Sequence, residues 1–199
     1  MRSTVWLLSI SLLLALSAAV ARADDFTDCF SVGTKSYADP SFYQKGLDAC
    51  TRLIGVRFGK RKAEAYAGRA SWLHKLGRED EALADYDKAL SIDPTNVEFY
   101  DYRGDSLVAK GDLDAAIANY DQAIRVDPTY AAAYYSRGKI YQDKGDIAHA
   151  RESYQAALVP PRERQIMMQG RIQEWAQVNA AKALDALNAP APAPAQPAK

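Results

Sequence analysis

The sequence predicts an all-α fold, a short solenoid of helix-turn-helix repeats closed by a C-terminal capping helix. One pattern recurs three times at a spacing of 34 residues, and a fixed period of this length is typical of stacked helical repeats. Each copy carries apolar and small residues at helical spacing, divided by a glycine into two helices. The recurring residues are Tyr66, Arg69, Gly77, Ala82, Tyr86 and Ala89, then Tyr100, Arg103, Gly111, Ala116, Tyr120 and Ala123, then Tyr134, Arg137, Gly145, Ala150, Tyr154 and Ala157.

The first 23 residues predict a secretion signal that lies outside the fold. Arg2 supplies positive charge, residues 5–20 are apolar, and Ala21-Arg22-Ala23 has the small residues of a cleavage site. We expect cleavage after Ala23 and a periplasmic or secreted protein with no membrane span. A retained anchor is disfavoured because a spanning helix needs about 20 apolar residues.

Residues 24–62 predict a degenerate helical cap in front of the repeats. Asp39-Pro40 opens a helix, and residues 55–62 form a linker. The chain has two cysteines, Cys29 and Cys50, and in an oxidising compartment such a pair most simply forms a disulfide. Two buried thiols are the alternative. One face of the helix carries Tyr43, Leu47, Cys50 and Ile54.

The three predicted repeats cover residues 63–96, 97–130 and 131–160. In the first repeat the leading helix has Tyr66, Arg69, Ala70 and Leu73 on one face. The second helix carries Ala82, Leu83, Tyr86, Ala89 and Leu90 on its inner face. The small alanines allow close approach of the two helices, and the tyrosines fill the space beside them.

Glycine and proline mark where the predicted helices end. Gly77, Gly111 and Gly145 follow the leading helices, because glycine adopts the left-handed backbone that closes a helix. Asp93-Pro94 and Asp127-Pro128 separate the repeats. We expect each aspartate to cap the following helix, with the proline in its first turn.

An arginine recurs in every repeat, as Arg69, Arg103 and Arg137. Strict recurrence indicates a structural role. We predict that each arginine pairs with a nearby acidic group, such as the aspartate before the repeat-ending proline.

The chain after the repeats predicts a cap and a tail. Residues 161–188 form the capping helix, which a terminal repeat needs for solubility. Its apolar stripe comprises Met168, Ile172, Trp175, Ala176, Ala183 and Leu187. Residues 189–199 alternate alanine and proline, so we expect a disordered tail.

The charge balance argues against a nucleic-acid partner. Removal of Arg2 and Arg22 with the signal segment leaves 23 basic against 25 acidic residues, a net charge of −2. Nucleic-acid binding needs a concentrated basic face instead. One basic run exists, which we interpret as the solvated start of a helix. It consists of Arg57, Lys60, Arg61 and Lys62.

The sequence predicts no catalytic residue, cofactor or metal site. It has no nucleophile elbow and no phosphate loop. His74 and His149 stand 75 residues apart, so no metal-ligand spacing is present. Asp101 and Asp105 lie one helical turn apart, but such carboxylate pairs are common on helix surfaces. We therefore do not expect an enzyme.

The repeated pattern resembles the tetratricopeptide repeat. Shared features are an aromatic residue at position 4, a small one at 8, a bulky one at 11, glycine at 15, Ala, Tyr and Ala at 20, 24 and 27, and proline at 32. The resemblance covers residues 63–158. Position 8 is Ala70 in the first repeat, position 7 carries arginine where the family often has leucine, and the third repeat lacks the aligned proline. The segment Ala49-Cys50-Thr51-Arg52 is similar to the leading portion of small exported repeat proteins of alphaproteobacteria.

The resemblance implies a right-handed superhelix whose leading helices line a concave groove for a partner polypeptide. Contacts in the family come from positions 2, 5, 6, 9, 12 and 13. Family members that grip a carboxylate use lysine and asparagine where this chain has Ala67 and Ser71, so we do not expect an acidic C-terminal peptide. The corresponding residues here are Glu64, Ser71, His74 and Lys75, then Glu98, Asp101, Tyr102 and Asp105, then Tyr135, Lys139, Gln142 and Asp143.

The acidic middle of this groove favours a basic partner segment, or one of mixed charge. Glu98, Asp101 and Asp105 supply the charge. The alternative is that these carboxylates form a solvated face with no ligand.

Tyr102, Tyr130 and Tyr135 are surplus to the repeat core and resemble interface anchors, because tyrosine supplies contact area at low entropic cost. Tyr130 could equally pack between repeats. The competing hypothesis for the whole chain is self-association into a homo-oligomer of the cell envelope, with Trp175 or Phe26 at the interface.

Overall fold

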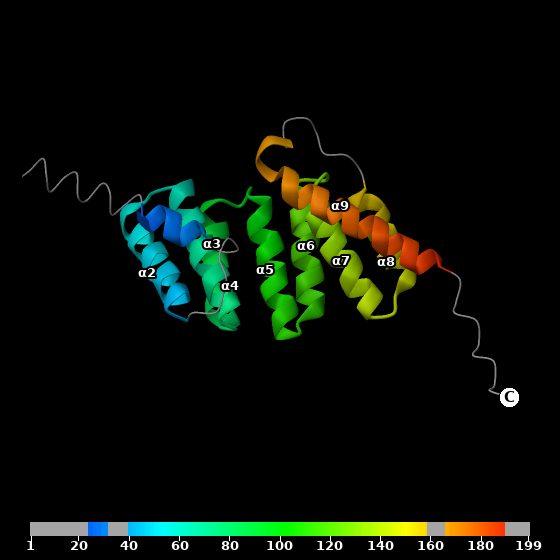
Figure 1. Ribbon diagram of the computed structural model, residues 1–199, viewed down its shortest axis with the longest axis horizontal. Helices are drawn as coiled ribbons and strands as arrows, with labels where there is room; N and C mark the ends of the chain where they lie inside the picture. The colour runs from blue at the N-terminus through cyan, green and yellow to red at the C-terminus, as the bar shows by residue number, and fades with distance from the viewer. Residues whose placement is uncertain (1–23, 32–39, 159–165, 190–199) are drawn as a thin grey trace, which may run out of the picture. The chain divides into compact units, whose positions relative to one another are not determined.

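The computed structural model describes residues 24–31, 40–158 and 166–189, and every regular element in these ranges is a helix (Figure 1). Residues 24–30 form a short helix ahead of the first labelled one. The predictions for residues 1–23, for Asp39, and for residues 159–165 and 190–199 lie outside the described residues. The labelled helices are α2 (Pro40–Val56), α3 (Lys60–Lys75), α4 (Glu79–Ile92), α5 (Val97–Lys110), α6 (Leu113–Val126), α7 (Ala131–Asp143), α8 (Ile147–Ala157) and α9 (Ile166–Asn188).

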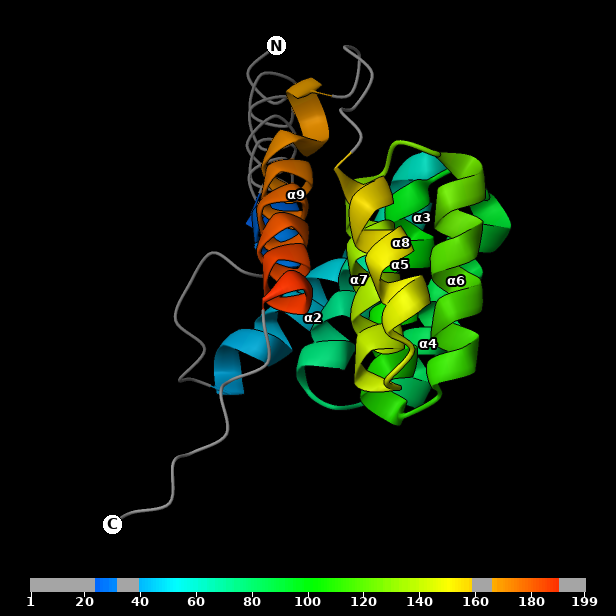
Figure 2. The same ribbon diagram turned by 90° about the vertical axis from the view of Figure 1, so that its right-hand side faces the viewer.

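The helices fall into two compact units, residues 1–111 and residues 112–199. In the first unit α2 packs on α3, α3 on α4, and α4 on α5. In the second unit α6 packs on α7, α7 on α8, and α9 runs along both α7 and α8 (Figure 2). The boundary follows α5, so it divides the predicted second repeat between its two helices.

The glycines that follow α3, α5 and α7 have left-handed backbones, as predicted. Gly77, Gly111 and Gly145 have φ angles of 71°, 82° and 78°. An added β-carbon at any of them would meet no atom within 4 Å. The backbone conformation, and not crowding, therefore requires glycine at these turns.

The prediction that Asp93 and Asp127 cap the following helices is wrong. Each aspartate follows the last residue of a helix, and its Oδ1 accepts hydrogen bonds from the backbone and hydroxyl of the threonine two residues later, Thr95 or Thr129. The prolines lie in these turns, before the next helix begins. The N-cap of α5 is Asn96, whose side chain accepts from the backbone N–H of Glu98. The Asp-Pro-Thr sequence therefore forms the inter-repeat turn and leaves helix capping to other residues.

The core of the first unit is built around Trp72 of α3, which is 0% exposed. Its Nε1 donates to the backbone oxygen of Cys29 over 2.9 Å. Phe42 and Tyr43 of α2 present their rings edge-on to it, at centroid distances of 5.2 and 6.0 Å. A β-carbon at Gly46 would lie 2.3 Å from the indole. Glycine is thus required where α2 crosses the tryptophan.

The cysteines form the predicted disulfide. Cys29 of the helix over residues 24–30 is bonded to Cys50 of α2, and both residues are fully buried. The linker predicted over residues 55–62 is shorter than expected. Helix α2 continues to Val56 and α3 begins at Lys60, so three residues connect them.

The core of the second unit depends on close helix approach. Ala150, Tyr154 and Ala157 of α8 are buried against α7. A β-carbon at Gly138 of α7 would lie 2.8 Å from the Tyr154 ring. The tyrosine therefore fills the space that the small residue at repeat position 8 leaves open.

The buried face of helix α9 coincides with the predicted stripe at Ala176 but not at Trp175. Trp175 was expected in that stripe, but it is 56% exposed. The side chain of Gln173 is buried, and its Oε1 accepts a hydrogen bond of 2.6 Å from the backbone N–H of Ala131, the first residue of α7. This bond satisfies an amide at the start of α7 that the chain's own N-cap residue leaves open. The buried face of α9 comprises Gln173, Ala176, Ala180 and Leu184.

Candidate partner-binding surfaces

The recurring arginines are structural, as predicted, but their partners are not the aspartates of the inter-repeat turns. Each carboxylate lies sixteen positions away along the chain. Arg137 also donates to the Ser153 hydroxyl over 3.1 Å, so it connects the helices before and after its own. The pairs are Arg69–Asp85, Arg103–Asp87 and Arg137–Asp121, with N···O distances of 2.6, 2.8 and 2.7 Å.

Three predicted groove carboxylates gather around one phenol on α5. Burial raises the pKa of Tyr102 well above its usual range, and the charges of Glu98, Asp101 and Asp105 raise it further. The Tyr102 ring packs against the core of the first unit. Asp101 is only 5% exposed, so it supplies negative charge more than contact area. Asp105 is exposed and Glu98 is half-buried.

Side chains of α3 and α4 adjoin this α5 group. Ser71 of α3 and Tyr86 of α4 share a hydrogen bond of 3.0 Å between their hydroxyls. Burial raises the pKa of Tyr86, the Ser71 bond opposes that rise, and the nearby Asp105 and Tyr102 reinforce it. The predicted positions on α3 and α5 therefore do come together through Tyr86.

A second link between α3 and α5 runs through His74. Its Nδ1 lies 3.0 Å from a carboxylate oxygen of Glu79 and 3.4 Å from the Ser106 hydroxyl of α5. Glu79 was absent from the predicted groove because it opens α4, a trailing helix. Lys75 is exposed beside it on α3, and Glu64 is exposed near the helix start. We call the group of Glu79, Glu98, Asp101, Tyr102 and Asp105 the acidic face.

The predicted site residues of the second unit take part in internal packing. Tyr135 of α7 is half-buried, with its ring 5.9 Å from Tyr154 and 5.2 Å from Trp175 of α9. Gln142 accepts a hydrogen bond of 2.7 Å from the Tyr154 hydroxyl. Lys139 is exposed and lies 3.7 Å from Asp143, one turn along the same helix. Only Lys139 and Asp143 therefore present mostly exposed side chains.

Tyr130 is fully buried at 0% exposure. It directly precedes α7 and acts as its N-cap residue without a side-chain cap. The interpretation of Tyr130 as an interface anchor is therefore wrong, and the packing alternative is confirmed.

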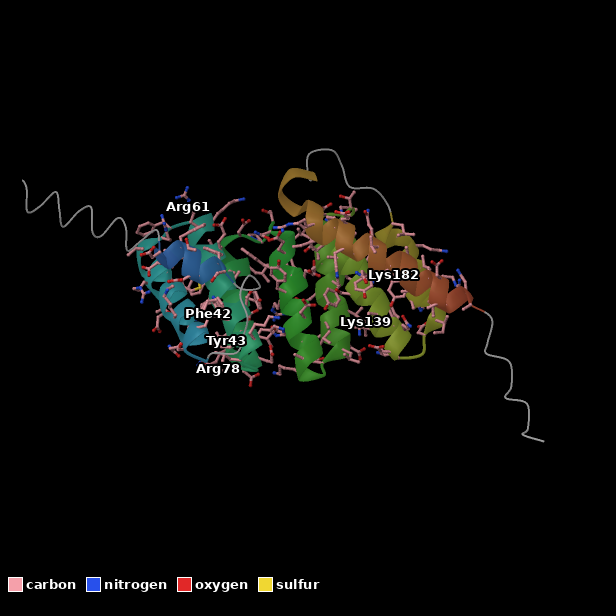
Figure 3. The ribbon with its side chains drawn as sticks, in the orientation of Figure 1. Phe42, Tyr43, Arg61, Arg78, Lys139 and Lys182 are labelled. Atoms are coloured by element: carbon pink, nitrogen blue, oxygen red, sulfur yellow. A yellow bond between two sulfur atoms is a disulfide. The ribbon has the colours of Figure 1, made fainter. Side chains whose placement is uncertain are left out.

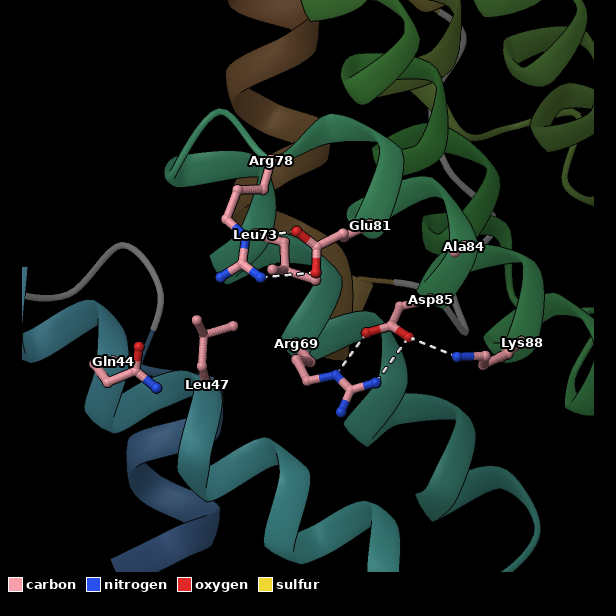
Figure 4. Close-up of a pocket in the computed structure, with 9 residues that line it drawn as sticks. All are labelled: Gln44, Leu47, Arg69, Leu73, Arg78, Glu81, Ala84, Asp85 and Lys88. Atoms are coloured by element: carbon pink, nitrogen blue, oxygen red, sulfur yellow. Dashed lines mark hydrogen bonds and ion pairs between the residues drawn. The ribbon is translucent and has the colours of Figure 1, made fainter.

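A cleft of about 370 Å³ lies between α2 and α4 over α3, and sequence reasoning missed it (Figure 4). Its charged side chains bind one another. Arg69 donates to both carboxylate oxygens of Asp85, Lys88 lies 3.3 Å from Asp85, and Arg78 forms two bonds of 2.7 Å to Glu81. These mutual pairs leave the cleft with little to offer a charged ligand.

The cleft and the acidic face use opposite faces of α3. Arg69 and Leu73 line the cleft, whereas Ser71 and His74 adjoin the acidic face. At 100° per residue these two pairs of positions point about 150° apart. The same helix thus presents a neutralised surface on one face and a negatively charged one on the other.

Neither a metal site nor a bilayer-spanning helix is found in the described part of the chain. Residues 24–31, 40–158 and 166–189 contain no group of three or more His, Cys, Asp or Glu side chains placed to hold a metal ion. None of the helices in these ranges is both long and apolar enough to cross a bilayer.

Three family models match the repeated segment. Two are described as tetratricopeptide repeat and match residues 63–96 and 85–118, and one described as TPR repeat matches residues 104–145. This is a tetratricopeptide repeat protein. A search of the curated proteins finds no match to this repeat protein.

Solved structures with a similar fold agree with this assignment. The crystal structure of MamA matches with a TM-score of 0.54 at 23% identity, covering 61% of this chain and 70% of that one. A thermophilic TPR protein of Thermus thermophilus matches with a TM-score of 0.54 at 22% identity, covering 72% and 75%. The Sgt2 TPR domain from Aspergillus fumigatus matches with a TM-score of 0.50 at 20% identity, covering 69% and 89%. These similarities establish the tetratricopeptide solenoid fold.

Proposed function

We propose that this repeat protein is a non-enzymatic interaction module that binds a basic or mixed-charge segment of a partner polypeptide on its acidic face. The observation that carries the proposal is the gathering of Glu98, Asp101 and Asp105 around Tyr102. An aromatic ring set among carboxylates suits a segment that presents lysine or arginine beside apolar residues.

The neighbouring helix strengthens this choice of partner charge. Ala67 and Ser71 occupy the α3 positions where a carboxylate clamp would need lysine and asparagine, and Ser71 is already bonded to Tyr86. Lys75 is the one lysine among the α3 groove positions. An acidic segment would therefore meet more repulsion than attraction here.

The test is peptide binding measured by fluorescence anisotropy. The probe is a labelled peptide of alternating lysine, serine and leucine, compared with the same peptide carrying glutamate for lysine. We expect the lysine peptide to bind more tightly and to lose affinity as salt is raised. The double variant Glu98→Gln/Asp105→Asn should weaken binding of the lysine peptide roughly fivefold, the loss expected from two charge contacts at the surface, one exposed and one half-buried.

The matched control removes two carboxylates from another part of the chain. Glu174→Gln/Asp185→Asn changes the net charge equally on α9, where both side chains are exposed. This variant should retain nearly wild-type affinity. Equal losses in the two double variants, or tighter binding of the glutamate peptide, would contradict the proposal.

We further propose that the protein works in the periplasm or outside the cell, after removal of residues 1–23. The apolar run over residues 5–20 and the disulfide between Cys29 and Cys50 support export, because disulfides persist in oxidising compartments. Fractionation of the native cells followed by mass spectrometry of the purified protein tests this. A mature chain that begins at Asp24 is expected, and a cytosolic chain that retains residues 1–23 would exclude it.

Self-association is the second candidate, and exposed aromatic rings favour it. Trp175 on α9 is more than half exposed, with Val178 exposed one turn further, and Phe26 is exposed on the short first helix. Sedimentation across a concentration range tests this candidate. A homo-oligomer that Trp175→Glu or Phe26→Glu converts to a monomer would support it, whereas a wild-type monomer at every concentration would exclude it.

A further inference from the structure

The turn between α2 and α3 carries an apolar side chain that the fold does not use. Phe58 is 85% exposed, the largest value among the large hydrophobic side chains of the described residues. Val56, at the end of α2, is 50% exposed. A phenylalanine gains its stabilisation by burial, so a ring left this open contributes little to folding.

The shape of the turn keeps Phe58 at an open tip. Gly59 has a φ of 55°, which reverses the chain directly before α3 begins at Lys60. A β-carbon added at Gly55 or Gly59 would meet no atom within 4 Å. The backbone on both sides of Phe58 is therefore uncrowded, and the ring itself is exposed over most of its surface.

Four cations surround this tip within six residues. Lys60 lies 3.3 Å from Asp93. Arg57, Arg61 and Lys62 form no ion pair with any described residue. Arg61 points outward from the start of α3 (Figure 3).

The first turn of α3 has no acidic residue and instead carries three of these cations. Cations at a helix N-terminus oppose the helix dipole, so this arrangement does not favour the isolated helix. The charge is therefore better explained by an anionic surface outside the chain.

We propose that this turn, residues 56–62, docks on an anionic lipid bilayer. Phe58 and Val56 enter the boundary between headgroups and acyl chains, and the cations around them contact lipid phosphates. A protruding apolar side chain next to several cations suits the surface of a lipid bilayer, which adapts to its shape. A protein partner would instead need a broader complementary surface. The basic run, interpreted from sequence as a solvated helix start, thus acquires a binding role. This inference does not depend on the acidic face.

The test is cosedimentation of the chain from Asp24 onward with vesicles. Residues 1–23 are omitted because their apolar run would bind vesicles by itself, and this chain contains every described residue. We expect binding to vesicles of phosphatidylcholine with phosphatidylglycerol, weak binding to phosphatidylcholine alone, and release by salt. Phe58→Ser should lower the partition coefficient at least fivefold, and Arg57→Gln/Arg61→Gln about 25-fold, from about fivefold for each cation.

Matched variants separate this turn from general charge and apolar effects. Arg171→Gln/Lys182→Gln removes two exposed cations from α9, where Figure 3 labels Lys182, and Ile147→Ser removes an exposed apolar side chain from α8. Both should bind anionic vesicles as the wild type does. Circular dichroism of every variant checks that the helices remain folded.

A fluorescent reporter tests insertion directly. In a Trp175→Phe background, Phe58→Trp places a tryptophan at the tip, while Trp72 stays buried and shielded. We expect anionic vesicles to shift its emission to the blue and brominated lipids to quench it. The proposal would be overturned in favour of a solvated turn if the emission did not shift, or if Phe58→Ser and the wild type partitioned equally. It would be overturned in favour of a general polyanion site if polyglutamate or duplex DNA, at equal charge, competed with the vesicles.

Discussion

The first and last described helical elements are held to their neighbours by different kinds of contact. Residues 24–31 are joined to α2 by the Cys29–Cys50 disulfide, and both segments pack on Trp72, whose indole donates a hydrogen bond to the Cys29 backbone oxygen. Helix α9 instead lies on α7 and α8 with two buried alanines, one leucine and the Gln173 hydrogen bond.

The difference shows two ways to close a helical array. A short element with little area to bury gains most from a covalent link, because the link restricts the unfolded chain. A helix of 23 residues has length enough to bury a whole stripe, and alanine lets its backbone approach closely. The leading end should therefore be sensitive to redox conditions and the trailing end to single hydrogen bonds.

The largest expected effect is that of replacing Trp72 of α3, compared with replacing Trp175 of α9. Trp72→Ala should lower the free energy of unfolding by about 3–5 kcal/mol, because it leaves a large cavity among Phe42, Tyr43 and Gly46. Trp175→Ala should cost about 1 kcal/mol, since it loses mainly one ring contact to Tyr135. Urea unfolding followed by circular dichroism measures both. Similar losses would remove the contrast between the ends.

The next effect concerns the disulfide. Cys29→Ala/Cys50→Ala should destabilise the leading end by about 3 kcal/mol, from a loop with a sequence separation of 21. Amide hydrogen exchange should locate the loss in residues 24–31 and α2 and leave α9 unchanged. Dithiothreitol should reproduce the loss in the wild type and have no effect on the variant. An equal rise in amide exchange in α9 would contradict a destabilisation confined to residues 24–31 and α2.

A smaller loss is expected from Gln173 of α9. Gln173→Met keeps the volume but removes the acceptor for the Ala131 N–H, which should cost about 1–3 kcal/mol. Thermal unfolding measures the change. Glu174→Met, at the exposed neighbouring position, serves as the control and should change stability little. If both variants have the same unfolding temperature as the wild type, the hydrogen bond between Gln173 and the Ala131 N–H does not stabilise the packing of α9.

The smallest effect is the alkaline behaviour of Tyr154. Burial raises its pKa to about 12, and the neighbouring Tyr135 and Asp143 add to the rise. An unfolded phenol ionises near pH 10, so the contribution of Tyr154 is complete below about pH 10 and lost as pH rises toward 12. Tyr154→Phe should lose about 1 kcal/mol at neutral pH with its bond to Gln142. The urea midpoint of this variant should then fall less steeply above pH 10 than that of the wild type. Equal slopes for the two proteins would contradict the raised pKa of Tyr154 in the folded chain.

Local and periodic features of this chain were predictable from its sequence. The helix-ending glycines follow from backbone conformation at a fixed spacing, and Ala82, Tyr86 and Ala89 are buried as their helical spacing predicts. The disulfide was predictable because the chain has only two cysteines. Each of these inferences needs information from one segment, or from one pair of residues.

Features that depend on contacts between distant segments were not predictable. The acceptor for the Ala131 N–H comes from Gln173, forty-two residues later, and no pattern links the two. The candidate site suffered the same limitation. The periodicity placed Glu98, Asp101 and Asp105 on one helix, but the burial of Asp101 and the position of Glu79 beside His74 depend on how α3, α4 and α5 pack. Phe58 did have a signal, an aromatic residue within a basic run.

Each recurring arginine pairs with an aspartate sixteen positions away, and this spacing determines which rearrangements of the repeats preserve the ion pairs. Arg103 and Arg137 bind acids in the preceding helix, but the residue sixteen positions before Arg69 is Leu53. Swapping the first and third repeats would therefore set a guanidinium against leucine. Duplicating residues 97–130 would instead supply a copy of Asp121 for each new arginine. The array can thus lengthen by tandem duplication at its middle, whereas its outer repeats are not interchangeable.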